Sequence, residues 1–112
     1  MPPPALQAFK ADFFRALAHP VRIRILETLG GGERSVQELQ HALDLEQPVV
    51  SQQLAVLRGR NIVTARKVGT SVRYALSDPL ITKLLAVARE IFNHHLVGTQ
   101  SMLKELKREA RR

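Results

Sequence analysis

Apolar residues near the start of the chain recur every three or four positions, the spacing that places them on one face of an α-helix. The residues with this spacing are Leu6, Phe9, Phe13 and Leu17. They predict an amphipathic helix over residues 6–18. His19 and Pro20 follow, and a residue that precedes proline avoids helical backbone angles. We therefore expect the first helix to end there.

A second helix is predicted to begin at Pro20, because proline suits the first helical turn, where its missing N–H is not needed. The apolar stripe of this helix is expected to be Ile23, Leu26 and Leu29. Arg22 and Arg24 lie between these positions and are free to face water. Three consecutive glycines at 30–32 end the pattern.

The next two predicted helices are short and are joined by a tight turn at 44–46. Ser35 and Glu38 have the spacing of a capping box, in which each side chain accepts a hydrogen bond from the other residue's backbone N–H. The apolar face of the first of these helices is expected to be Leu39, Ala42 and Leu43. Pro48 lies in the first turn of the second helix, whose inward stripe is Val50, Leu54 and Leu57. This pattern over residues 35–59 is that of a helix-turn-helix.

Polar side chains occupy the outward positions of the second of these helices. They are Gln47, Ser51, Gln52 and Arg58. Gln and Ser can both donate hydrogen bonds to base edges and accept them in the major groove of DNA. Asn61 follows the helix and is expected to end it in the left-handed conformation.

The pattern then changes to β-strands and returns to a long helix. Residues 62–68 and 71–76 are rich in β-branched residues and flank Gly69, which predicts a β-hairpin over 62–76. Ser77 and Asp78 precede a helix predicted over 79–108, which Gly98 weakens without ending. Its apolar stripe is Leu80, Leu84, Val87, Ile91, His95, Leu103 and Leu106.

The predicted fold class is mainly α with a small β-hairpin, in the order α-α-α-α-β-β-α. Two helices joined by a tight turn and followed by a two-stranded ribbon form a winged helix-turn-helix. With 112 residues, of which 45% are hydrophobic, the chain has room for one domain, which we expect to span residues 1–112.

The charge of the chain indicates what kind of partner this fold binds. The formal net charge is +7, from 17 Lys and Arg against 10 Asp and Glu, which suggests a polyanionic partner. No acid occurs between Gln47 and Ser77, whereas this stretch contains the cations Arg58, Arg60, Arg66, Lys67 and Arg73. Such a stretch suits the approach of DNA phosphates. The alternative is a solvated basic surface on an interaction domain.

Three phrases of the sequence resemble the ArsR/SmtB family of bacterial transcriptional regulators. They are FFRALAHPVRIRIL at 13–26, VSQQLAVLR at 50–58 and ARKVGTSVRY at 65–74. The resemblance extends over residues 9–97, nearly the whole chain. The helix-turn-helix and wing segments together indicate this family more specifically than either segment alone.

The resemblance implies a homodimer, in which the helices at 6–18 and 79–108 pack across a two-fold axis. It implies that the helices following the turn enter successive major grooves of an operator with inverted repeats. The positions that match the family's DNA contacts are Gln47, Pro48, Ser51 and Gln52 in the helix and Arg66, Lys67 and Arg73 in the wing. Double-stranded DNA is thus the expected partner.

Many members of this family are released from DNA by a metal ion, and this chain matches their sites only in part. One family site uses cysteines in the helix corresponding to 35–43, but the chain has no cysteine. Another site lies on the last helix, where Asp78 and His94 match ligand positions. Leu80 and Ile91 stand where the family has histidine.

The residues themselves also suggest candidate ligands on the last helix. Glu90 and His94 are four residues apart and share a helix face, and His95 and Asp78 are further candidates. Carboxylate and imidazole ligands suit Ni²⁺ or Zn²⁺, and a second subunit can supply the remainder. The alternative is that His95 fills the apolar stripe while His94 faces solvent. Of the other histidines, we expect His19 to be structural and His41 to be inert.

Other functional classes are disfavoured. The chain has no glycine-rich phosphate loop, no recognisable pair of catalytic acids and no Ser-His-Asp arrangement, so we do not expect an enzyme. It has neither a signal peptide nor an apolar run long enough to cross a bilayer, which predicts no membrane partner and a cytoplasmic location. The alternatives to a sequence-specific regulator are a non-specific architectural DNA-binding protein and a winged-helix interaction module.

Overall fold

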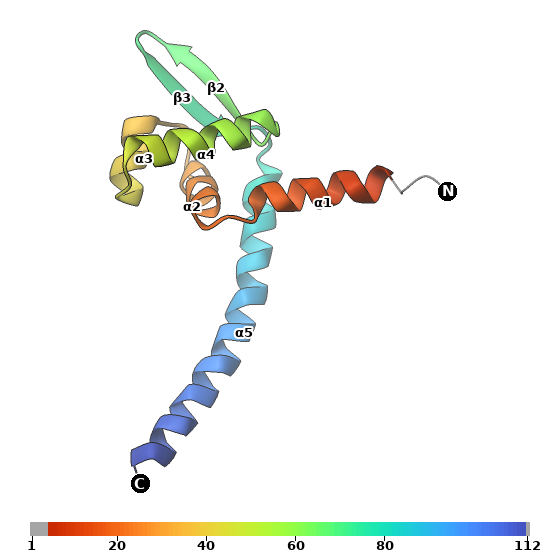
Figure 1. Ribbon diagram of the computed structural model, residues 1–112, viewed down its shortest axis with the longest axis vertical. Coiled ribbons are helices and arrows are strands. Elements are labelled where there is room, and N and C mark those ends of the chain that lie inside the picture. The colour runs from red at the N-terminus through yellow and green to blue at the C-terminus, as the bar shows by residue number, and fades with distance from the viewer. Residues whose placement is uncertain (1–4, 112) are drawn as a thin grey trace. The chain divides into compact units, whose positions relative to one another are not determined.

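The computed structural model of the chain describes residues 5–111. Its elements, in chain order, are α1 (Ala5–Leu17), α2 (Pro20–Leu29), β1 (Arg34–Ser35), α3 (Val36–Leu43), α4 (Gln47–Gly59), β2 (Val63–Val68), β3 (Ser71–Leu76) and α5 (Leu80–Arg111) (Figure 1). The chain forms two compact units, which divide between Thr82 and Lys83. The predicted fold class, mainly α with a small β-hairpin in a winged helix-turn-helix, is confirmed.

The core of the first unit lies among α2, α3, α4 and the base of the hairpin. Its most deeply buried side chains are Ile25, Leu26, Leu39, Val50, Leu54, Leu57, Ile62 and Val63. The inward stripe predicted for α4 is therefore confirmed. On α2, Leu26 and Leu29 are buried as predicted and Ile23 is half-buried. Ile25 is buried as well, because α2 packs against both α3 and α4 and so buries a wider arc. Ala42, predicted to face inward on α3, is exposed.

Side chains cap the first turns of α2 and α3. The Nδ1 atom of His19 accepts a hydrogen bond from the backbone N–H of Val21 at 3.1 Å, so His19 is the N-cap of α2. Its predicted structural role is thus confirmed. The capping box is also present, since Ser35 Oγ accepts from the Glu38 N–H and Glu38 Oε1 accepts from the Ser35 N–H, each at 3.1 Å. Asn61, just beyond α4, is left-handed as predicted, with φ 59°.

The sheet has three antiparallel strands in the order β1-β3-β2. Gly69 turns the hairpin in the left-handed conformation, with φ +62°. The predicted order of elements did not include strand β1, so the prediction of a two-stranded hairpin alone is corrected to a three-stranded sheet. Two residues are too few to show alternation, and β1 forms only because Arg34 and Ser35 pair with Tyr74 and Arg73 of β3. Such pairing depends on distant residues, which a local pattern does not reveal.

Helix α5 runs without interruption through Gly98, as predicted. The Oδ1 atom of Asp78 accepts a hydrogen bond from the N–H of Leu80 at 2.9 Å and so caps the first turn of the helix. Among the helices of residues 5–111, none is both long enough and apolar enough to cross a membrane.

Candidate nucleic-acid interface

Two neighbouring grooves lie between α4 and the hairpin, and one of them also borders the start of α3. One, of about 430 Å³, is lined by Ser51, Leu54, Ala55, Arg58, Gly59 and Tyr74. The other, of about 600 Å³, is lined by Val36, Gln37, Gln47, Ser51, Thr70, Ser71, Val72 and Tyr74. Ser51 and Tyr74 line both grooves. Hydroxyl and amide groups thus dominate the polar lining, and these can hydrogen-bond to bases, sugars or phosphates.

The outer face of α4 brings together the side chains that the sequence predicted to contact DNA. Gln47, Pro48, Gln52 and Arg58 are exposed, and Ser51 is half-buried. Gln47 Nε2 donates a hydrogen bond to Ser51 Oγ at 2.9 Å. Because Val50, Leu54 and Leu57 fix the opposite face in the core, the orientation of this polar face is set by packing.

Two arginines of α2 also hold the helix-turn-helix in place. Arg22 donates through Nε to Gln53 Oε1 of α4 at 2.8 Å and through Nη1 to the carbonyl oxygen of Ala16 at 3.2 Å. Arg24 Nη2 donates to the carbonyl oxygen of Leu43, at the end of α3, at 2.9 Å. Arg24 is exposed, as the sequence allowed, and Arg22 is half-buried, but both also make hydrogen bonds that the sequence pattern did not predict. Their partners lie on helices that the sequence pattern could not bring next to them.

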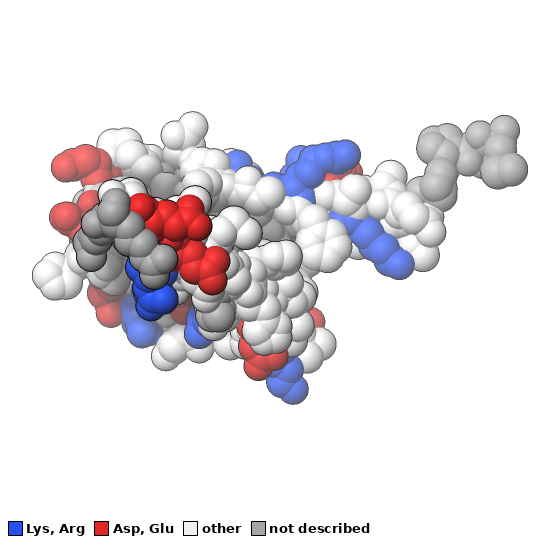
Figure 2. Space-filling view, turned by 90° about the horizontal axis from the view of Figure 1, so that it is seen from below, with Lys and Arg blue, Asp and Glu red and all other residues white. Residues whose placement is uncertain are grey.

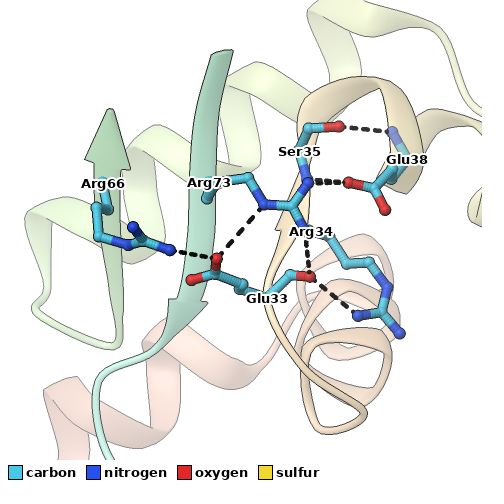
Figure 3. A network of polar contacts seen from close by, with 6 residues as sticks. All are labelled: Glu33, Arg34, Ser35, Glu38, Arg66 and Arg73. Atoms are coloured by element: carbon cyan, nitrogen blue, oxygen red, sulfur yellow. Dashed lines mark hydrogen bonds and ion pairs between the residues drawn. The ribbon is translucent and has the colours of Figure 1, made fainter. Parts of the chain in front are cut away.

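The three cations predicted in the wing differ in their surroundings. The Lys67 side chain is exposed and makes no ion pair or hydrogen bond within the described residues. Arg66 Nη2 lies 2.5 Å from Glu33 Oε1. Arg73 contacts Glu38 Oε1, and its Nε lies 3.5 Å from Glu33 Oε1 (Figure 3). Residues 47–77 contain no acid, but in the folded chain two of their arginines contact Glu33 and Glu38.

Glu33 and Glu38 are the residues of this surface that sequence reasoning missed. Glu38 was identified only as a capping residue, and Glu33 was not identified at all. The pKa of the Glu38 carboxyl is lowered mainly by the hydrogen bond from the Ser35 backbone N–H and also by Arg73, against the opposing effect of desolvation. The interactions that lower this pKa stabilise the fold at pH values above the usual pKa range of a carboxyl group. This stabilisation is lost as the pH falls through the lowered pKa. The contact with Arg73 is therefore present at neutral pH.

The candidate metal ligands are not gathered into a site. Glu90, His94 and His95 are exposed on α5, and Asp78 caps the start of that helix. Residues 5–111 contain no cluster of three or more histidines, cysteines or acids able to hold a metal ion. One chain by itself therefore does not fit a metal centre.

Known proteins share both the sequence and this arrangement. A helix-turn-helix domain family matches residues 17–66. The HTH-type transcriptional regulator Rv0081 of Mycobacterium tuberculosis is 45% identical over 103 residues, which cover 91% of this chain and 90% of that protein. The transcriptional repressor SmtB homologue of Synechocystis is 38% identical over 84 residues, covering 75% of this chain and 61% of that protein. The chain belongs to the ArsR/SmtB family.

Solved structures agree with this membership. The crystal structure of Rv0081 matches with a TM-score of 0.76 and 46% identity over 84% of this chain and 95% of that chain. The solution structure of the homodimeric winged helix-turn-helix DNA-binding domain of Mb0332 from Mycobacterium bovis matches with a TM-score of 0.74 and 30% identity, over 82% of this chain and 85% of that chain. This ArsR/SmtB protein is thus a transcriptional regulator with a helix-turn-helix DNA-binding domain and, as predicted, not an enzyme.

Proposed function

We propose that the protein is a repressor that binds double-stranded DNA as a homodimer and reads an inverted-repeat operator with the outer face of α4. The observation that carries this proposal is the polar face of Gln47, Ser51 and Gln52 beside the grooves along β3. A helix with small polar side chains on one face fits the major groove and its base edges. Because its partner is DNA, we expect the protein in the cytoplasm.

Cations flank this face and suit contacts to phosphate. Arg58 lies at the end of α4 and Lys67 in β2, and both are exposed. Phosphate contacts set the register of a protein on DNA, whereas base contacts give it sequence preference. We therefore assign positioning on the backbone to these cations and base reading to the outer face of α4.

We expect the substitutions Ser51→Ala and Gln52→Ala to lower sequence preference without unfolding the protein. Each good base contact contributes about 1–3 kcal/mol of discrimination. The measurement is affinity for a duplex selected from a random pool by the unaltered protein, compared with affinity for unselected DNA. Gln100→Ala, the same change at an exposed position of α5, is the matched control.

Three outcomes would contradict this assignment. If both variants kept full preference, α4 would not read the bases. If the unaltered protein showed no preference between selected and unselected duplexes, the chain would be an architectural DNA-binding protein. If it bound no DNA, it would be a winged-helix interaction module.

Dimerisation is supported by the apolar side chains exposed on α1 and α5. The large ones are Leu6, Phe9, Phe14, Leu80, Val87, Ile91, Phe92, Leu96, Met102, Leu103 and Leu106. In Figure 2, uncharged side chains make up most of the visible surface of α1. Each helix by itself thus exposes several large apolar side chains, and large exposed apolar patches mark sites of association. We expect a second copy of the chain to cover these apolar side chains, since the similar domain of Mb0332 is homodimeric.

A metal response stays a prediction, and it requires ligands beyond those that one chain gathers among the described residues. Because one chain gathers fewer than three ligands within the described residues, we expect weak binding of Zn²⁺ or Ni²⁺, completed by the partner or by water. Calorimetric titration of the unaltered protein and of His94→Ala with each metal tests this expectation. Equal affinity in both proteins would exclude His94, and no binding in either would indicate a different effector.

A further inference from the structure

The facing strands of the wing bring two like charges together. Arg66 of β2 and Arg73 of β3 are directly opposite partners in the hairpin register. Directly opposite side chains point to the same face of a sheet, where like charges repel. The Glu33 carboxylate, which precedes β1, contacts both guanidinium groups through Oε1 (Figure 3). It therefore offsets the repulsion that the hairpin register creates.

The two arginines are nevertheless held to different degrees. The Arg73 side chain is only 28% exposed. It also donates through Nη1 to Glu38 and through Nη2 to the carbonyl oxygen of Glu33, the latter at 3.1 Å. Arg66 is 65% exposed, and Glu33 Oε1 is its hydrogen-bond partner. Arg73 is thus fixed by several internal acceptors, whereas Arg66 is held by one exposed pair.

Arg73 also joins the wing to the helix-turn-helix. Its partner Glu38 belongs to the first turn of α3 and completes the capping box with Ser35. In addition, Ser35 pairs with Arg73 in the sheet. A single guanidinium group of β3 therefore contacts both the loop before β1 and the start of α3.

We propose that Arg73 is a positioning residue of the wing and that Glu33 competes with DNA phosphates for Arg66. This inference rests on the proposed function, because it concerns how the same surface presents its charges to DNA. An exposed ion pair is weak, so a phosphate can displace Glu33 from Arg66. Lys67, which has no such partner within the described residues, contacts phosphate without competition.

The salt dependence of DNA binding separates these roles, because each phosphate that a cation neutralises steepens the plot of log affinity against log salt by about 0.9. The probe is the selected duplex, titrated over a range of salt concentrations. For Glu33→Gln we expect affinity about two- to fivefold higher at low salt. The slope should be steeper by up to about 0.9 per subunit, the limit that applies if Glu33 keeps Arg66 from phosphate in the unaltered protein. Lys67→Gln should make the slope shallower by about the same amount. Arg73→Gln should weaken binding to every duplex and leave the slope unchanged.

Glu46→Gln is the matched control for Glu33→Gln. It removes the same charge from an exposed carboxylate at the start of α4. Because Glu46 makes no ion pair within the described residues, the substitution frees no cation. If Glu33→Gln behaved like Glu46→Gln, the competition would be excluded. If Arg73→Gln flattened the slope as much as Lys67→Gln, Arg73 would be a phosphate contact and its positioning role would be wrong.

A second measurement tests the positioning role without DNA. Glu38→Gln keeps the capping interaction, since glutamine serves in capping boxes, but it removes the charge that faces Arg73. We expect Glu38→Gln and Arg73→Gln each to lower Tm by a few degrees, and the double variant to lower it by less than the sum. Additive shifts would overturn the positioning role. Failure of the unaltered protein to bind any duplex would instead overturn the proposed function and, with it, the competition by Glu33.

Discussion

Replacing Ile91 with aspartate is expected to convert the protein from a dimer into a monomer of 12.6 kDa. The Ile91 side chain is 52% exposed within one chain and lies on the apolar face of α5. If a second copy covers this face, the substitution would bury a charge that has no partner. Burying an unpaired charge strongly destabilises an interface. Light scattering at micromolar concentration measures the change, with about twice the chain mass expected for the unaltered protein.

DNA affinity should fall together with the dimer. A dimer that engages both halves of an inverted repeat gains about 10²–10⁴-fold over a single module, and Ile91→Asp should lose that gain. Asn93→Asp is the matched control, because it adds the same charge two residues away, toward the opposite side of the helix, at an exposed polar position. A monomeric unaltered protein, or equal effects of the two variants, would contradict the two-fold interpretation.

Local patterns were sufficient to predict most of the elements. Helix ends depend on a few neighbouring residues, so the capping box of Ser35 and Glu38 and the left-handed Asn61 could be inferred from the sequence. The inward stripe of α4 was equally local, and it fixed which polar residues face outward. These features place Gln47, Ser51 and Gln52 on one surface, which the structure reproduces.

The parts that could not be predicted depend on residues far apart in the chain. The stretch from 47 to 77 contains no acid, yet Glu33 and Glu38 reach Arg66 and Arg73 across the sheet. Strand β1 makes this possible, and its two residues carry no pattern of their own. A charge count along the sequence therefore overestimates the number of uncompensated cations that a surface presents.

The apolar face of α5 is also wider than the predicted stripe. The predicted stripe followed Leu84, Val87 and Ile91, whereas Phe92 and Leu96 are large, apolar and exposed as well. Their signal was present in the sequence, since Leu85, Ala88, Phe92 and Leu96 repeat with steps of three and four. A wider face is what a helix needs to pack against more than one partner helix.

Leu57→Ala is expected to cause the largest loss of stability of the substitutions considered. The Leu57 side chain is 0% exposed and anchors the last turns of α4 in the core. Removing it should lower the free energy of unfolding by about 2–5 kcal/mol, the range for leucine truncations that leave a cavity. Small domains have about 5–15 kcal/mol in total, so a large share of the stability would be lost.

The measurement is urea unfolding of both proteins at the same concentration, because association contributes to the apparent stability of a dimer. Val49→Ala is the matched control on the same helix, where the side chain is 38% exposed. We expect that variant to stay within about 0.5 kcal/mol of the unaltered protein. Leu57→Ala should also weaken DNA binding, because the outward face of α4 is held in place by its inward stripe. Equal unfolding free energies for Leu57→Ala and Val49→Ala would mean that α4 is not anchored through this side chain, and the orientation of its polar face would then need another cause.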